Sequence, residues 1–188
     1  MKKILAVLTL FVCLFALPFT AGAERQGQKV KGYAFNKTKV VYLKSLVKKD
    51  SDFFTANPGL TREDDAVRLT YLNLKKSFRG ESVDVYNNPV MLPDKYLRRT
   101  VTMQVIVNYA ATAPLTGEEA ARAAKDKREP VESLVSLTFF VTKNGEAIYQ
   151  MVDSRRSSKK DVNALIKEIT DQVADELTSK SMKLEGVL

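Results

Sequence analysis

The sequence predicts an α+β domain in two layers, with a mixed but mostly antiparallel sheet of about five strands and two main helices on one face. Three observations predict it. Residues 100–110 alternate with period two between an apolar face and a mostly polar face, two helical stretches each have a single apolar stripe, and Asn144-Gly145 separates two strand-like runs. A one-faced sheet and a striped helix each need a partner for their apolar side, and packing them together gives two layers.

The first 23 residues have the three parts of a bacterial secretory signal peptide. Lys2 and Lys3 precede an apolar run over residues 4–17, and Ala21 and Ala23 supply small side chains for signal peptidase. The run is shorter than the roughly 20 residues of a membrane-spanning helix. We expect cleavage after Ala23 and a periplasmic or secreted product that can associate with the envelope; an uncleaved anchor is the alternative.

The residue types exclude most catalytic and metal chemistry. Cys13 is the single cysteine, and it follows Val12 inside the apolar run, where a lipoprotein signal would have a small residue. We interpret it as lost with the leader. The remaining chain has neither cysteine nor histidine, which excludes Ser-His-Asp and Cys-His catalysis and the common zinc and haem ligand sets. We therefore expect no catalytic residue, no metal, no cofactor and no enzyme activity.

The amino-terminal part of the mature chain is expected to be irregular. Residues 24–37 are predicted to be a loosely ordered basic segment, in which Tyr33 and Phe35 could start a strand. The apolar run Val40-Val41-Tyr42-Leu43 is typical of a strand buried on both faces. Pro58-Gly59 indicates that residues 48–58 form a loop.

A helix is predicted to start at Thr61 and to end before Gly80. Thr61 and Asp64 form an approximate capping box at its start, and Gly80 suits the C′ position at its end. Its apolar stripe consists of Leu60, Val67, Tyr71, Leu74 and Phe78. A short strand over residues 82–86 follows, and the strand–helix–strand unit should be right-handed with parallel strands.

Three long strands and a final helix complete the predicted domain. The strand over residues 100–110 places alternate residues on its buried face, namely Val101, Met103, Val105, Val107 and Tyr109. A polar insert with a short helix precedes a strand over residues 131–142, and Asn144-Gly145 turns it into a hairpin. Ser157 or Ser158 caps the last helix, whose stripe consists of Val162, Leu165, Ile166, Ile169, Val173 and Leu177. Residues 38–179 are expected to form one domain, the three strands an antiparallel meander, and residues 180–188 a tail.

The distribution of charged residues along the chain identifies candidate residues for binding a partner. Removing Lys2 and Lys3 lowers the formal net charge from +8 to +6, and residues 24–60 contain eight Lys/Arg against three Asp/Glu. The candidates are cations of this segment and charged residues at the end of the last strand: Lys39, Lys44, Lys48, Lys49, Asp153, Arg155 and Arg156. A solvated surface and an ion pair at a strand end are the simpler interpretations. Nucleic acid is not expected, because export removes the usual target.

The first strand Lys39–Leu43, a helix ending before Gly80, the hairpin return Gly145–Tyr149 and the long final helix together resemble the small α/β modules of cell-envelope proteins. Examples are the amino-terminal domain of the Tol-system propeller protein and the curli-secretion lipoprotein. The resemblance covers about residues 38–178. It implies a scaffold or adaptor role in an envelope complex and no catalytic residues.

We therefore expect an exported envelope accessory protein without catalytic activity, which docks to an envelope protein or to an anionic membrane surface. The alternative is a periplasmic carrier of a lipid or small apolar ligand, with a pocket lined by Tyr71, Phe78, Met103 or Phe139. The sequence leaves the oligomeric state open.

Overall fold

The computed structural model describes residues 24–29 and 37–178. They form one seven-stranded mixed sheet with the order β1-β7-β6-β5-β2-β4, and β3 pairs with β5 off this path. The strands are β1 (Glu24–Lys29), β2 (Val40–Lys48), β3 (Thr61–Arg62), β4 (Asp84–Tyr86), β5 (Thr100–Pro114), β6 (Val131–Lys143) and β7 (Glu146–Ser157). The α+β class is confirmed, and β1 and β3 are the strands that the sequence did not predict.

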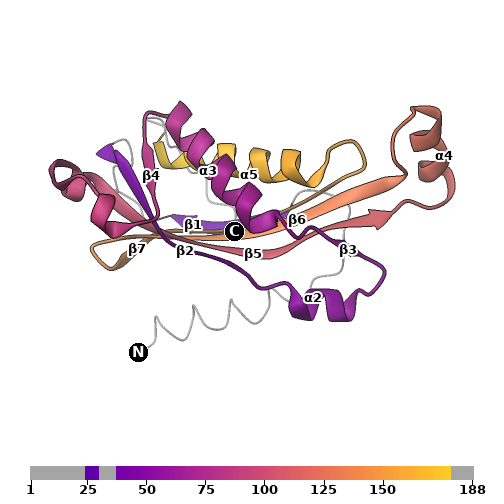
Figure 1. Ribbon diagram of the computed structural model, residues 1–188, viewed down its shortest axis with the longest axis horizontal. Coiled ribbons are helices and arrows are strands. Elements are labelled where there is room, and N and C mark those ends of the chain that lie inside the picture. Colours follow the sequence, from indigo (N-terminus) through magenta and orange to yellow (C-terminus); the bar gives the residue numbers. More distant parts are fainter. Residues whose placement is uncertain (1–23, 30–36, 179–188) are drawn as a thin grey trace.

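Two long helices cover one face of the sheet. Helices α3 (Ala66–Gly80) and α5 (Val162–Thr178) lie side by side on this face, whereas α2 (Ser51–Ala56) lies on the opposite side and α4 (Gly117–Lys125) at one end (Figure 1). The prediction of two main helices on one face is therefore confirmed. In the described ranges no helix is both long and apolar enough to cross a membrane.

The strand pairing follows the predicted topology. Strands β2 and β4, which flank α3, are parallel, and β2 is also parallel to β5. Strands β5, β6 and β7 form the antiparallel meander. The insert with α4 lengthens the β5–β6 connection, as expected.

Alternate residues of β5 and β6 form the core against α3 and α5. A bulge in β5 interrupts this alternation. The register shifts between Val107 and Tyr109, so Ala110 takes the core position opposite Val135. Ala110 is fully buried, and Tyr109 instead stacks on Phe53 of α2 on the other side of the sheet. The prediction that Tyr109 shares the buried face with Val107 is wrong, because the bulge adds one residue to the strand.

Two predicted helix starts are corrected. Thr61 does not cap α3, since Thr61 and Arg62 pair with β5 as strand β3, and α3 begins at Ala66. The last helix begins at Val162, because β7 continues to Ser157. The Asp161 carboxylate accepts the backbone N–H of Ala164 at 2.6 Å. This bond supplies the cap that the sequence assigned to the serines.

Two segments predicted to be irregular contain regular structure. Helix α2 lies within the predicted loop 48–58, and residues 24–29 form β1 along β7 rather than a loose segment. Gly27 permits this pairing, since a Cβ there would lie 2.5 Å from the carbonyl oxygen of Gln150. The predicted leader over residues 1–23, the strand start at Tyr33 and Phe35 and the tail over residues 180–188 lie outside the described residues.

Candidate functional site

A fully buried carboxylate on β7 organises a polar cluster between the sheet and α5. Asp153 is 0% exposed, and acidic side chains are almost never fully buried unless they are paired. Arg155, two residues further along the same strand face, donates Nε to Oδ1 at 2.8 Å and Nη2 to Oδ2 at 2.9 Å. This two-pronged geometry satisfies both carboxylate oxygens with charge-assisted hydrogen bonds.

Strand β1 brings a second arginine to the same carboxylate. Arg25 lies opposite Asp153 in the β1–β7 register, and its Nε is 3.4 Å from Oδ2. Its Nη2 donates to Glu176 Oε2 at 2.8 Å and to the Tyr149 hydroxyl at 3.2 Å. Arg25 therefore connects the first described strand to β7 and to α5.

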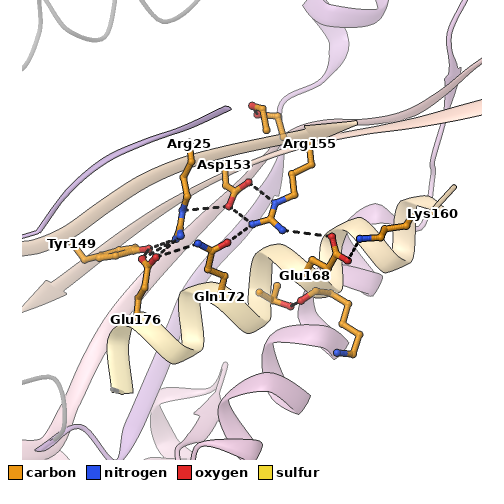
Figure 2. Close-up of polar contacts among 12 residues, drawn as sticks. Arg25, Tyr149, Asp153, Arg155, Lys160, Glu168, Gln172 and Glu176 are labelled. Atoms are coloured by element: carbon orange, nitrogen blue, oxygen red, sulfur yellow. Dashed lines mark hydrogen bonds and ion pairs between the residues drawn. The ribbon is translucent and has the colours of Figure 1, made fainter. Parts of the chain in front are cut away.

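The far side of the cluster is built by α5. Arg155 also donates to the side chain of Gln172 and lies 3.6 Å from Glu168 Oε2, and Glu168 in turn pairs with Lys160. Figure 2 shows these side chains as a continuous row from Lys160 to Glu176, in which Arg25 and Arg155 flank Asp153. Charges of opposite sign alternate along the row, so each buried charge has a partner.

Two groups of the cluster, Tyr149 and Arg155, have a raised pKa. Burial, together with the negative charge of Glu176, raises the pKa of Tyr149 far above its ordinary value, and its hydroxyl donates to Glu176 at 2.9 Å. The hydrogen bond to Asp153 raises the pKa of Arg155. Neither group gives up a proton near pH 7, whereas an efficient general acid or base has a pKa near the operating pH. The arrangement suits a clamp that holds strands and helix together.

Arg156 does not belong to this cluster. Successive side chains of a strand point to opposite faces of the sheet, and Arg156 pairs with Glu132 of β6 on the face away from α5, with Nη2 2.8 Å from Oε1. Of the two arginines that follow Asp153 in the sequence, only Arg155 forms the expected ion pair at the strand end. Arg155 and Arg156 contribute to different surfaces.

The four candidate lysines lie along β2 and at the residues directly before and after it. Lys48 lies 3.3 Å from Asp50 and donates to the carbonyl oxygen of Glu63 at 2.8 Å, so it links β2 to the segment before α3. Lys44 and Lys49 are exposed, and Lys39 is half-buried. The structure thus does not gather the lysines and the β7 residues into one site.

An aromatic cluster on the α2 side was missed by the sequence analysis. The rings of Phe53 and Tyr109 stack with centroids 4.0 Å apart, Phe54 meets Phe53 edge-on at 5.4 Å, and Arg62 lies 4.7 Å above the Phe54 ring. The adjacent phenylalanines were the available signal. They were assigned to a loop because Pro58-Gly59 follows them.

A polar patch lies beside this aromatic cluster. Asn108, at the bulge of β5, donates to Ser136 at 3.0 Å and to Thr138 at 2.8 Å, and Ser154 donates to Ser136 at 2.8 Å. These hydrogen bonds join β5, β6 and β7 on the face opposite α3 and α5. The patch consists of mutually satisfied hydroxyl and amide groups.

A surface cleft of about 340 Å³ lies between the start of α5 and the β5–β6 connection. Its lining mixes both charges, with Arg128 and Lys160 among the cations and Glu63, Glu129 and Asp161 among the acids. Within the described part of the chain, no group of three or more histidine, cysteine, aspartate or glutamate side chains is placed to hold a metal ion.

The side chains considered for a ligand carrier lie in or against the core. Phe78 is 1% exposed, Met103 and Phe139 are 0% exposed, and Tyr71 packs against the margin of the same cluster. Their contacts with one another and with the helices account for their burial.

Comparisons with known proteins identify the fold. No protein-family model matches the sequence. No curated protein sequence matches it either. Among solved structures, the chain is similar to PelC from Paraburkholderia phytofirmans, determined as a dodecamer, with a TM-score of 0.54 and 14% identity over 85% of this chain and 99% of that chain. A single-substitution variant of the same dodecamer gives a TM-score of 0.53 and 12% identity over the same shares.

Proposed function

We propose that this protein is an accessory component of the bacterial cell envelope, without catalytic activity, that works as an assembly of several copies of its own chain. The observation that carries the proposal is the likeness to a PelC chain, which this chain covers over 99% of its length and which assembles as a dodecamer. The alignment therefore spans almost the whole of a chain that was determined as a dodecamer. The signal-peptide pattern of residues 1–23 supports an envelope location.

The sheet is compatible with assembly by a repeated contact. Within the described ranges its two edges are formed by different strands, β1 on one side and β4 on the other. A contact between two different surfaces is heterologous, and repeating such a contact closes into a ring when the rotation between copies permits. Edge strands are also natural sites for pairing between chains.

A non-catalytic role fits the chemistry of the polar cluster. Asp153 accepts hydrogen bonds from Arg155 on both carboxylate oxygens, and the Tyr149 hydroxyl donates a hydrogen bond to Glu176. These side chains bond to one another, and their contacts join β1, β7 and α5. We propose that the protein acts by docking to other envelope components, with an anionic membrane surface as one of them.

Crosslinking in intact cells tests location and self-assembly together. The tagged full-length chain is treated with an amine-reactive crosslinker that passes the outer membrane but not the inner one. We expect a processed chain and a ladder of bands at integer multiples of its mass. The matched control lacks residues 2–23 and should stay unreacted inside the cell. An unprocessed chain, or a protected chain in the presence of the leader, contradicts the envelope location, and a monomer band alone contradicts the assembly.

A further inference from the structure

Three large apolar side chains stand exposed on one short connection between β4 and β5. This connection contains two 3₁₀ helices, η2 (Pro89–Met91) and η3 (Asp94–Arg99). The exposed fractions are 89% for Val90, 64% for Met91 and 53% for Leu97. Clustered apolar exposure on a soluble surface usually marks an interaction site. We call residues 89–99 the apolar tip.

Hydrogen bonds hold the apolar tip in a defined shape. The side chain of Asn88 accepts the backbone N–H of Val90 at 3.0 Å. Lys143, the last residue of β6 before the β6–β7 hairpin turn, donates to the carbonyl oxygens of Arg98 at 2.8 Å and Thr100 at 2.6 Å, and burial lowers its pKa. The backbone of the tip lies at the end of the sheet where this hairpin turns (Figure 1). Its three large apolar side chains are exposed there.

Cations surround the exposed apolar side chains. Lys95, Arg98 and Arg99 belong to the tip itself and are exposed. The Arg99 side chain donates to the carbonyl oxygen of Lys37 at 3.1 Å, and the Arg99 carbonyl oxygen accepts the backbone N–H of Lys39 at 2.9 Å. Two further lysines therefore lie beside the tip. Among the described residues, the acidic side chains placed here include Asp94 in the tip itself, Asp84 next to Lys39 and Glu146 opposite Lys143. The cations number six when Lys143 is included. The apolar tip therefore has a positive surround.

We propose that the apolar tip is a contact surface for an anionic lipid bilayer. Val90, Met91 and Leu97 enter the interfacial region, and Lys95, Arg98 and Arg99 pair with lipid phosphates, which is the combination that binds peripheral proteins to membranes. Each cation near an anionic surface strengthens binding by roughly fivefold. A second copy of this chain is itself a net cation, with a formal charge of +6 once Lys2 and Lys3 are removed, whereas an anionic bilayer offers the complementary charge and an apolar layer beneath it.

This inference deepens the proposed function and rests on its envelope location, but it does not depend on the number of copies in the assembly. Lipid binding is measured with added vesicles, whereas assembly is measured from mass in their absence. A protein that assembles but does not bind vesicles overturns the inference alone. A protein that binds vesicles as a monomer overturns only the proposed assembly.

A single tryptophan reports directly on insertion, since the chain contains none. We would prepare residues 24–188 with Met91→Trp and, as the matched control, with Leu72→Trp on α3, where Leu72 is 49% exposed. With vesicles of phosphatidylglycerol and phosphatidylcholine, emission from Met91→Trp should move to shorter wavelength and be quenched by lipids brominated in their acyl chains. The Leu72→Trp emission should stay unchanged.

Three results would overturn the proposal. The first is an unchanged Met91→Trp emission on the anionic vesicles, and the second is an equal change for Leu72→Trp. The third is a Met91→Trp emission that is already shifted without vesicles and varies with protein concentration, because another copy then covers the tip.

Substitutions separate the apolar and charged contributions. Combining Val90→Ser, Met91→Gln and Leu97→Gln should weaken vesicle binding by on the order of a hundredfold or more. The control Val47→Ser with Leu72→Gln, which removes exposed apolar side chains elsewhere, should not weaken it.

Lys95→Gln with Arg98→Gln should weaken binding by more than tenfold on the anionic vesicles and little on pure phosphatidylcholine. Lys75→Gln with Lys125→Gln is the charge-matched control. Circular dichroism verifies the fold of every variant, and equal losses for test and control sets would refute the assignment to the tip.

Discussion

The guanidinium of Arg25 lies 3.4 Å from the carboxylate of Asp153, so an ion pair links strand β1 to strand β7. Asp153 is completely buried, and Arg155 occupies its other side. Arg25 and Arg155 are themselves only 19% and 16% exposed. The carboxylate therefore neutralises two cations that water reaches poorly.

Removing that carboxylate should destabilise the protein strongly. Asp153→Ala leaves both arginines without their shared anion, and breaking a buried pair on one side typically costs about 3–5 kcal/mol. Urea unfolding followed by circular dichroism measures the loss in the free energy of unfolding. The control is Asp126→Ala, which breaks the more exposed pair with Arg128 and should cost at most about 1 kcal/mol. Equal effects at the two positions would show that the cluster does not hold the fold.

Gly27 should be required for the docking of β1. Its Cβ in Gly27→Ala would lie 2.5 Å from the backbone oxygen of Gln150 and 2.6 Å from Met151 Cε, and such overpacking costs about 1–3 kcal/mol. Hydrogen exchange should show faster exchange in β1 and along β7. Gly59→Ala has no atom within 4 Å of the new Cβ, and we expect it to leave exchange in β1 unchanged. Slow exchange of β1 in Gly27→Ala would contradict the observed register.

The stacked rings of Phe53 and Tyr109 should hold α2 against the sheet. No residue of α2 is fully buried, so this contact at 4.0 Å is a principal attachment of the helix. A double-mutant cycle with Phe53→Ala and Tyr109→Ala should give a coupling energy of about 0.5–1.5 kcal/mol. The same cycle with Tyr86→Ala, on the distant strand β4, should give a coupling near zero. A vanishing coupling for the stacked pair would mean that α2 is held by other contacts.

Acid should weaken the contact between the two long helices. Asp171 of α5 accepts the Ser77 hydroxyl of α3 at 2.6 Å and pairs with Lys167. Burial alone would raise the pKa of Asp171, but the hydrogen bonds from Lys167 and Ser77 outweigh it, so the pKa lies below the usual 3.8. A depressed pKa in the folded state means that this stabilisation is present above pH 3.8 and is lost as the pH falls through the folded value.

Thermal unfolding as a function of pH tests whether the stabilisation by Asp171 is lost in acid. The difference in Tm between the natural chain and Asp171→Asn should be largest near neutral pH and should shrink as the pH falls below about 4. Asp175→Asn, on the exposed side of the same helix, provides the background. A difference in Tm that grows on acidification would contradict the assignment.

Periodicity predicted the parts of the fold that share one buried face. The stripe from Val162 to Leu177 and the alternation in residues 100–107 each report a repeated contact with the core, so the two long helices, the parallel unit and the meander were predictable. Strand β1 was not, because its sequence Glu24–Lys29 is polar and its stability comes from pairing with a strand far along the chain. The position of Tyr109 on the opposite face from Val107 was equally unpredictable. A bulge is recognised from the strand pairing and not from the residue pattern of the strand.

The candidate site was predictable only where partners are close in the chain. Asp153 and Arg155 are two residues apart on one strand face, and their ion pair was expected. Arg25 was not expected in the cluster, because its contact depends on the β1–β7 register, and Arg156 was assigned to it although it points to the other face. The apolar tip was not predicted, since isolated apolar residues near prolines have no periodicity.

The mass of the purified protein in solution tests the proposed assembly most directly. We would measure residues 24–188 by native mass spectrometry and by light scattering over a range of concentrations, without vesicles. A discrete species at an integer multiple of the monomer mass, retained on dilution, is the expected result. A monomer at every concentration, from a sample that circular dichroism shows to be folded, would contradict the proposal that the protein works as an assembly of its own copies.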